Sequence, residues 1–253
     1  MSFLYTRCLR KEFGGVIAVD DVDINFEEHS ITGIIGPNGA GKTTLFNMIT
    51  GLEIPTEGFI FFRGMDITGL PSYRIARLGI SRTFQNIRLF KEMTVLENVM
   101  VGRHFKGKTN LPYFVLNFFG EDSGEKRIFE NAMKWLEFFN LQDYRNELAR
   151  NLPYGKQKEL EIARAMALEP VLLFLDEPAA GMNPAETDEL MRLIYRIYEM
   201  GVTVVLIEHD MRLVMNICKR IVVLNYGSKI AEGVPFEIQN NPLVIEAYLG
   251  REE

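Results

Sequence analysis

A glycine-rich stretch near the start of the chain is the feature that most limits what this sequence can form. It reads Gly36-Pro37-Asn38-Gly39-Ala40-Gly41-Lys42-Thr43-Thr44. An apolar segment precedes it and a segment with helical spacing follows it, so its context is strand, loop and helix. Glycines allow such a loop to turn its backbone N–H groups inward, and the next helix directs its positive end toward the same point. The stretch therefore predicts a site for phosphate groups.

The end of this stretch narrows the expected ligand to a nucleoside triphosphate. The pattern is G-x-x-x-x-G-K-[ST], with Gly36, Gly41, Lys42 and Thr43 at its fixed positions. In this pattern the lysine reaches the β- and γ-phosphates, and the hydroxyl after it is placed to bind Mg²⁺. We expect every residue from 36 to 44, which we call the phosphate loop, to line the site. The alternative is an ordinary glycine turn before a helix.

The composition is that of a globular chain, and its net negative charge argues against general binding of nucleic acid. Of the 253 residues, 47% are hydrophobic and 25% are charged, which suits one large domain or two modest ones. A net charge of −6 argues against a general nucleic-acid-binding face. The two cysteines, Cys8 and Cys218, are far apart in sequence and favour a reducing compartment. Apolar runs are shorter than the ~20 residues of a membrane span and the N-terminus has no signal-peptide pattern, so we expect a soluble protein that reaches membranes through a partner.

The order of expected elements indicates an α/β fold that is interrupted by helices. The first 85 residues are rich in strand patterns, a helical pattern covers about residues 86–167, and strands alternate with helices again from residue 171. These patterns predict a three-layer α/β core with a helical insertion. Strands are expected at 16–19, 22–26, 59–62, 80–85, 171–175, 202–207 and on both sides of a turn at 225–228; helices are expected at 71–78, 95–101, 124–139, 155–168, 184–200, 211–218 and 243–249.

One connector within the helical part is unusually aromatic. Residues 111–120 read Leu-Pro-Tyr-Phe-Val-Leu-Asn-Phe-Phe-Gly. Two interpretations remain open for this segment: it folds back onto the small helical core, or it forms a docking surface for a partner.

Two consecutive carboxylates follow one of the apolar strands. Asp176 ends the run that starts at residue 171, and Glu177 comes next. A phosphate loop needs an acidic strand end to complete a Mg²⁺ site, and we expect Asp176 to hold the ion, through water. A carboxylate at Glu177 can polarise the water that attacks the γ-phosphate, which favours hydrolysis. The alternative is an ordinary acidic turn before Pro178.

Two further polar residues follow expected strands and complete the predicted site. Parallel strands deliver their carboxyl ends to the same edge of a sheet, so His209 should converge with Asp176 and the phosphate loop. A histidine there can hydrogen-bond the γ-phosphate and the catalytic water. Gln85 ends another expected strand and could reach the metal or the attacking water. The predicted catalytic residues are thus Glu177, His209, Gln85 and Lys42, and the predicted metal site is Thr43, Gln85 and Asp176.

The whole set of motifs resembles one family. The phosphate loop, Gln85 and the segments 152–157, 173–178, 180–183 and 208–210 occur in the order seen in ATP-binding-cassette (ABC) ATPases. The chain looks most like the ATP-binding subunits of branched-chain amino-acid importers, although urea importers and lipopolysaccharide-export ATPases are similar. That closer resemblance rests on Phe13-Gly14-Gly15, on Arg82-Thr83-Phe84-Gln85 and on residues 93–99, 176–184 and 246–250.

The resemblance implies an architecture and an activity. The expected fold is a P-loop NTPase core with an antiparallel β subdomain and a helical subdomain, in a single ABC ATPase domain over 1–253 with its core at 1–85 and 168–253 and its helical subdomain at about 86–167. The implied function is ATP hydrolysis, with Mg²⁺, that powers a membrane transporter. Phe13 resembles the aromatic residue that stacks on adenine; the alternative is a core strand residue. Gln85 begins the loop that senses Mg²⁺ and the membrane partner, and Asn183 lies in the loop that crosses to the other active site.

The resemblance also implies partners. Two ATP-binding subunits, identical or merely similar, close head to tail around two ATP molecules. Permease subunits in the membrane bind this dimer at the cytoplasmic face, and an extracytoplasmic solute-binding protein acts indirectly; nucleic acid is not an expected partner. The transported solute is recognised by those other subunits and cannot be read from this chain.

One motif departs from the pattern of the family. The usual Leu-Ser-Gly-Gly-Gln is replaced by Leu152-Pro153-Tyr154-Gly155-Lys156, followed by Gln157, and we call residues 152–157 the signature segment. Proline has neither a hydroxyl nor an N–H, so the usual serine contact to the γ-phosphate is absent. Pro153 and Gly155 are expected to face the nucleotide of the other subunit, with Gly155 at a helix N-terminus. Lys156 adds a positive charge near the phosphates or is simply solvated.

Two other functions compete with that of a transporter ATPase, and each is associated with a sequence feature that can be looked for. A soluble ABC ATPase of DNA repair or translation usually carries a long coiled-coil insertion or two cassettes, and this chain has neither pattern. A phosphoryl-transfer enzyme or GTPase is the second rival, but the guanine-reading Asn-Lys-x-Asp pattern does not occur in this sequence.

Overall fold

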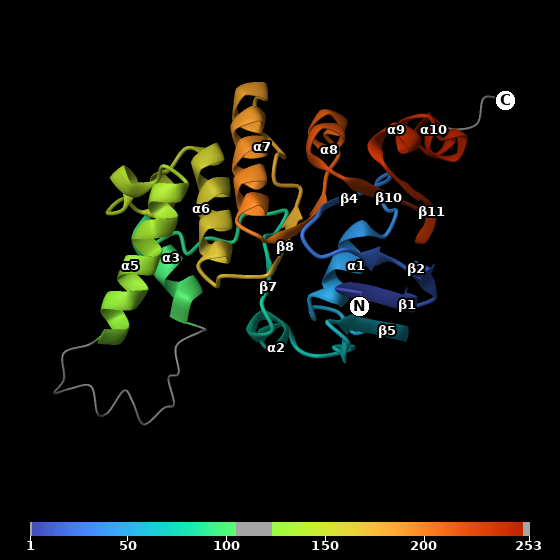
Figure 1. Ribbon diagram of the computed structural model, residues 1–253, viewed down its shortest axis with the longest axis horizontal. Helices are drawn as coiled ribbons and strands as arrows, with labels where there is room; N and C mark the ends of the chain where they lie inside the picture. The colour runs from blue at the N-terminus through green and yellow to red at the C-terminus, as the bar shows by residue number, and fades with distance from the viewer. Residues whose placement is uncertain (1, 105–122, 250–253) are drawn as a thin grey trace. The chain divides into compact units, whose positions relative to one another are not determined.

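The computed structural model describes residues 2–104 and 123–249, and the chain forms two compact units. The first unit consists of Met1–Gln85 and Val171–Glu253, and the second of Asn86–Pro170. The aromatic connector at 111–120 lies outside the described residues. Both ends of the second unit join the first, so the helical unit is an insertion in sequence (Figure 1).

A six-stranded central sheet organises the first unit. Its strand order is β11-β10-β4-β9-β8-β7, with every neighbouring pair parallel except the antiparallel pair β10–β11. Every residue of β4, β8 and β9 is buried, which explains why these strands are continuous apolar runs in the sequence. The strands are β4 (Ile31–Ile35), β7 (Ile80–Arg82), β8 (Leu172–Asp176), β9 (Thr203–Ile207), β10 (Arg220–Asn225) and β11 (Ser228–Gly233).

A second, antiparallel sheet lies in the same unit. It has the order β2-β1-β5-β6, and β3 also pairs with β1. The strand expected at 22–26 is wrong as one element, because Ile24 donates its N–H to the Thr6 hydroxyl and the Asp23 carboxylate accepts from the N–H of Cys8. These side-chain contacts replace part of the ladder. The strands are β1 (Leu4–Phe13), β2 (Val16–Val22), β3 (Asn25–Phe26), β5 (Glu57–Phe62) and β6 (Met65–Asp66).

Helices complete the layers of the first unit. Helix α1 lies between the two sheets, and α7 and α8 lie on the other side of the central sheet (Figure 1). One core cluster joins Phe46 of α1 with Phe174 of the central sheet and Phe62 of the antiparallel sheet. This arrangement confirms the predicted α/β fold with an antiparallel β subdomain. The helices are α1 (Lys42–Ile49), α2 (Ser72–Arg77), α7 (Pro184–Glu199), α8 (Met211–Ile217), α9 (Pro235–Gln239) and α10 (Pro242–Leu249); α9 was not predicted.

The second unit is helical. It contains α3 (Val95–His104), α5 (Ser123–Phe138) and α6 (Tyr154–Met166), with short 3₁₀ turns at Gln142–Tyr144 and Ala149–Asn151. Helix α5 buries Ala132, Trp135 and Leu136, which explains the helical spacing of these apolar residues. Among the helices that the structure describes in either unit, we find none that is both long and apolar enough to traverse a lipid bilayer.

Candidate nucleotide site

The phosphate loop joins β4 to α1 and requires glycine at two positions. Gly36 has φ +150°, and a Cβ there would lie 2.0 Å from the carbonyl oxygen of Leu224. Gly41 has φ +96°, and a Cβ would lie 2.3 Å from the carbonyl oxygen of Ala18. A side chain at either position would collide with backbone that cannot move aside cheaply. The neighbouring strands β2 and β10 therefore fix the path of the loop.

Lys42 is the first residue of α1 and its side chain folds back into the loop. Its Nζ donates to the carbonyl oxygens of Gly36 at 2.7 Å and Pro37 at 2.9 Å. Burial lowers the pKa of the Lys42 ammonium, and the charges of Glu177 and Asp176 oppose that shift. The ammonium is thus held inside the loop and within electrostatic range of both carboxylates.

Asp176 ends β8 and is buried. Its Oδ2 accepts from Nη2 of Arg82 at 2.7 Å, whereas Oδ1 is buried and has no hydrogen-bond partner among the described residues. A buried carboxylate oxygen without a donor is costly unless a cation or water serves it. The Thr43 side chain is exposed one position into α1. These oxygen donors fit a hard divalent cation, and Mg²⁺ is the ion that phosphate sites of this kind use.

Glu177 receives side chains from two other segments. Its Oε2 accepts from Nε2 of Gln85 at 2.9 Å, and its Oε1 lies 3.0 Å from Nε2 of His209. The backbone of Glu177 has φ +47°, a strained value for this residue type that turns the chain sharply after β8. The structure therefore brings Gln85 and His209 to Glu177, whereas the sequence analysis named Asp176 and the phosphate loop as the neighbours of His209.

The expected strand over 80–85 is wrong in its length. Strand β7 ends at Arg82, and only residues 80–82 are paired in register with β8. The N–H of Thr83 still bonds to the carbonyl of Phe174, and the chain then leaves the sheet edge. Gln85 thus reaches Glu177 from an irregular segment, which is a freer attachment than a strand end.

Two residues near the site were missed by the sequence analysis. Arg82 bonds to Asp176, as described above. Glu208 is almost fully buried, and its Oε1 accepts from the N–H of Ala179 at 2.7 Å while Oε2 accepts from the N–H of His209 at 3.0 Å. Burial raises the pKa of Glu208, and the backbone donors lower it. Glu208 directly precedes His209, Arg82 lies three positions before Gln85, and both stand in segments that carry the family resemblance.

Phe13 lies at the end of β1, beside the turn to β2. Its side chain is 44% exposed, so the alternative of a core residue is wrong. The ammonium of Lys11 lies 4.7 Å from its ring centroid, which leaves the ring in a cationic setting. An exposed aromatic face of this kind is available for stacking.

The signature segment lies in the second unit, at the start of α6. Pro153 is the N-cap of this helix, Gly155 is buried in its first turn, and Tyr154 is exposed. Lys156 binds Glu159 of the same helix at 2.8 Å. The Lys156 charge is therefore neither simply solvated nor unopposed, because a carboxylate one turn away compensates it.

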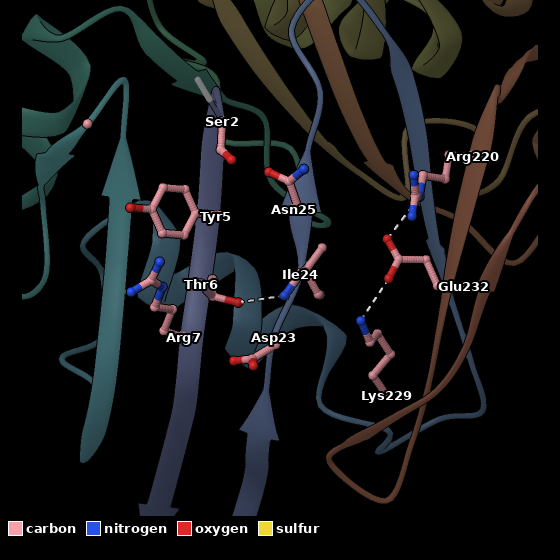
Figure 2. A pocket seen from close by; sticks show the side chains of 11 residues that line it. Ser2, Tyr5, Thr6, Arg7, Asp23, Ile24, Asn25, Arg220, Lys229 and Glu232 are labelled. Atoms are coloured by element: carbon pink, nitrogen blue, oxygen red, sulfur yellow. Dashed lines mark hydrogen bonds and ion pairs between the residues drawn. The ribbon is translucent and has the colours of Figure 1, made fainter.

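A cavity elsewhere in the first unit is distinct from these residues. It measures about 470 Å³ and is lined by residues of β1, β3 and β11, with none of the predicted site residues among them. Glu232 binds Arg220 at 2.9 Å and Lys229 at 2.7 Å, so two of the cations that line the cavity have an anionic partner (Figure 2). The cavity does not contribute to the nucleotide site.

Comparison with known proteins decides the family. Residues 19–180 match the family described as ABC transporter, and residues 228–253 match the one described as branched-chain amino acid ATP-binding cassette transporter. This chain belongs to the ABC transporter family. Membership makes it a nucleotide-binding ATPase, which confirms the enzyme class and the resemblance inferred from the motifs.

Individual relatives cover nearly the whole chain. The high-affinity branched-chain amino acid transport ATP-binding protein BraF of Pseudomonas aeruginosa is 50% identical over 246 residues, which are 96% of this chain and 95% of BraF. LivG of Escherichia coli, which has the same description, is 48% identical over 243 residues, with 96% and 95% covered. A nucleotide-free ATP-binding cassette from an ABC transporter has a TM-score of 0.87 at 36% identity, with 99% of this chain and all of that structure covered.

Proposed function

We propose that this chain is the ATP-hydrolysing subunit of an importer of branched-chain amino acids. The observation that carries the hydrolytic part is the position of Glu177, held by Gln85 and facing His209 directly after a buried strand. The printed descriptions of BraF and LivG support the choice of solute, because both relatives are branched-chain amino acid transport proteins and match the chain over 96% of its length.

The phosphate loop binds ATP in this proposal. Its N–H groups and the N-terminus of α1 hold the phosphates, and Lys42 exchanges the carbonyl oxygens of Gly36 and Pro37 for phosphate oxygens. Phe13 stacks on the adenine ring, which adds about 0.5–1.5 kcal/mol beyond burial. The contacts proposed for the loop are made by Gly36, Pro37, Asn38, Gly39, Ala40, Gly41, Lys42, Thr43 and Thr44.

Mg²⁺ fits the same site. Asp176 offers the buried oxygen Oδ1, which lacks a partner among the described residues, and the Thr43 hydroxyl and the Gln85 side chain complete the proposed donors. When bound, the ion neutralises charge that develops on the phosphate oxygens.

Hydrolysis depends on the carboxylate of Glu177. It accepts a hydrogen bond from the attacking water and polarises it toward the γ-phosphate. His209 donates to the γ-phosphate, and its 3.0 Å contact with Glu177 aligns the carboxylate. Gln85 holds the second oxygen of Glu177 and leads directly into the second unit, so the same residue links the site to the helical subdomain.

A second subunit completes each site. Gly155 presents the N-terminus of α6 to the γ-phosphate bound by the partner chain, with Pro153 beside it. A dimeric ATP-binding cassette bound to ADP and Pi matches this fold with a TM-score of 0.79 at 27% identity, over 92% of this chain and 99% of that structure. We propose a head-to-tail dimer, of two copies of this chain or of this chain with a similar subunit.

The partners follow from the transporter role. The dimer lies at the cytoplasmic face of the membrane and binds permease subunits, while an extracytoplasmic solute-binding protein acts through them. One ABC ATPase domain is proposed for residues 1–253, and its helical subdomain passes the motion of the dimer to the permease.

Uptake in the native host tests this function. Deletion of the coding sequence should abolish uptake of labelled leucine, isoleucine and valine, and the wild-type chain should restore it while Glu177→Gln should not. Normal amino-acid uptake together with loss of urea uptake, or with loss of lipopolysaccharide export, would reassign the solute. Normal transport of all three would contradict the transporter role.

A further inference from the structure

Arg82 lies at the end of β7, and its buried side chain makes polar contacts with several segments. Its guanidinium donates to Oδ2 of Asp176 at 2.7 Å, to Oδ1 of Asn47 at 2.7 Å and to the hydroxyl of Thr50 at 3.0 Å. Its Nε donates to the carbonyl of Thr83 at 3.2 Å. The Arg82 side chain is 7% exposed and that of Asp176 is 2% exposed. The ion pair is therefore inside the protein, where its geometry is fixed.

The contacts of Arg82 connect two structural elements of the candidate site. Asn47 and Thr50 belong to α1 and the residue directly after it, and Asp176 ends β8. The N–H of Asp176 also lies 3.3 Å from the hydroxyl of Thr83, so the segment after β7 holds both the backbone and the side chain of the aspartate. Asp176 cannot rotate without breaking this set of bonds.

The two oxygens of Asp176 are consequently unequal. Arg82 occupies Oδ2, while Oδ1 is buried without a partner among the described residues. An ion at this site, held directly or through a bound water, meets one available oxygen of Asp176. Mg²⁺ keeps most of its waters and uses one or two carboxylate oxygens in strict octahedral geometry, whereas Ca²⁺ takes more oxygens and accepts both oxygens of one carboxylate.

We propose that Arg82 is a positioning residue that restricts Asp176 to one free oxygen and thereby favours Mg²⁺ over Ca²⁺ at the nucleotide site. This inference rests on the proposed ATPase site. Arginine suits the task because its planar guanidinium carries five donors in a fixed fork, so one side chain serves Asp176, Asn47 and Thr50 together. A lysine ammonium carries its three donors on one rotating nitrogen and lacks the fixed planar fork of the guanidinium.

Divalent-ion binding to the full chain tests the proposal without relying on turnover. Mg²⁺ and Ca²⁺ are each titrated against Mn²⁺, observed by electron paramagnetic resonance, in the presence of a non-hydrolysable ATP analogue. In Arg82→Met the affinity for Mg²⁺ should fall about tenfold, as is usual when the partner of a metal ligand is removed. The affinity for Ca²⁺ should fall by less, because Ca²⁺ loses its waters more readily and can then bind both released oxygens of Asp176. Binding of the analogue in EDTA should not change.

Two further variants keep the test decisive. Arg63→Met removes an arginine whose 2.6 Å ion pair with Glu28 is exposed, and it should leave both affinities unchanged. If Arg82→Met does not fold, Arg82→Lys takes its place, and the preference for Mg²⁺ over Ca²⁺ should fall at least about threefold.

The outcomes separate this proposal from the proposed function. Equal losses for the two ions, or a ratio that stays at the wild-type value in the folded variant, would overturn the role of Arg82 and leave the ATPase site intact. Failure of the wild-type chain to bind Mn²⁺ with the analogue would instead contradict the metal site of the proposed function.

Discussion

The two units hold their functional residues in different ways. In the first unit Asp176 and Glu177 each receive partners from separate segments: Arg82 on one carboxylate, Gln85 and His209 on the other. In the second unit Lys156 of the signature segment binds Glu159, which lies one turn further along the same helix. In the first unit, side chains from several segments are held around the two carboxylates. In the second unit, the signature segment presents the N-terminus of a helix. In the proposed function, this difference assigns recognition of the nucleotide to the signature segment and the chemical step to the residues around Glu177.

Glu177→Gln should have the largest effect. The amide keeps the shape but loses the negative charge that polarises water, so turnover should fall on the order of 10²–10³-fold. ATP binding should remain, and the variant should accumulate the closed dimer. Steady-state ATPase assays and equilibrium dialysis measure the two quantities, with the exposed Glu28→Gln as the matched control. Near-normal turnover would remove Glu177 from the mechanism.

Lys42→Ala should act on binding. Lys42 is buried and makes two hydrogen bonds inside the loop, which ATP would replace with phosphate contacts. Truncating a buried, hydrogen-bonded charge of this kind costs on the order of 2–5 kcal/mol, so calorimetry should show ATP affinity lowered by more than tenfold. Lys126→Ala on the exposed face of α5 is the control. An unchanged dissociation constant would count against the phosphate loop.

Phe13→Ala tests whether the nucleotide site of the first unit extends to the antiparallel sheet. Loss of stacking should weaken ATP binding by about 0.5–1.5 kcal/mol. Phe59→Ala is a close control, because Phe59 is 54% exposed on β5 of the same antiparallel sheet. Equal losses in the two variants would mean that Phe13 does not touch the adenine ring.

Pro153→Ser changes the signature segment of the second unit and should have the smallest effect on ATP-dependent dimerisation. A serine hydroxyl at this N-cap regains a donor for the γ-phosphate and should tighten the ATP-bound dimer by about 1 kcal/mol. Sedimentation of the Glu177→Gln background with ATP measures the change. Pro71→Ser is the control, since Pro71 is also an extended N-cap proline, at the start of α2. Dimerisation that does not change would mean that position 153 is not in contact with the nucleotide.

The parts of this structure that follow local rules could be predicted from the sequence. The phosphate loop, the buried strands and most helices are specified by residue patterns within each segment, and contacts with distant segments do not change them. The hairpin turn is an example: Tyr226 and Gly227 both have positive φ, as the turn between β10 and β11 requires. The rule that parallel strands end at a common edge also placed His209 near the end of β8, where it contacts Glu177, the residue after Asp176.

The parts that depend on side chains far apart in sequence could not be predicted. Arg82 and Asp176 are separated by 94 positions, and nothing in either segment indicates the ion pair. The interruption between β2 and β3 depends on the Thr6 hydroxyl, which is 18 positions from Ile24. Strand β7 stops pairing at Arg82, opposite Phe174, although β8 continues to Asp176. Each of these is a tertiary contact that overrides a local pattern.

Mixing two defective variants tests most directly whether each nucleotide site needs the first unit of one chain and the signature segment of another. Glu177→Gln keeps an intact signature segment, and Gly155→Asp keeps an intact strand-edge site while adding a carboxylate that repels the γ-phosphate. Gly155 is buried in this chain, so circular dichroism and ATP binding first establish that the variant is folded. Each variant alone should be inactive.

An equal mixture should regain roughly a quarter of the wild-type ATPase activity at the same total concentration, because about half of the dimers are mixed and each of those has one complete site. A mixture as inactive as its components, although both bind ATP and the wild-type chain hydrolyses it, would contradict the claim that two chains share each site.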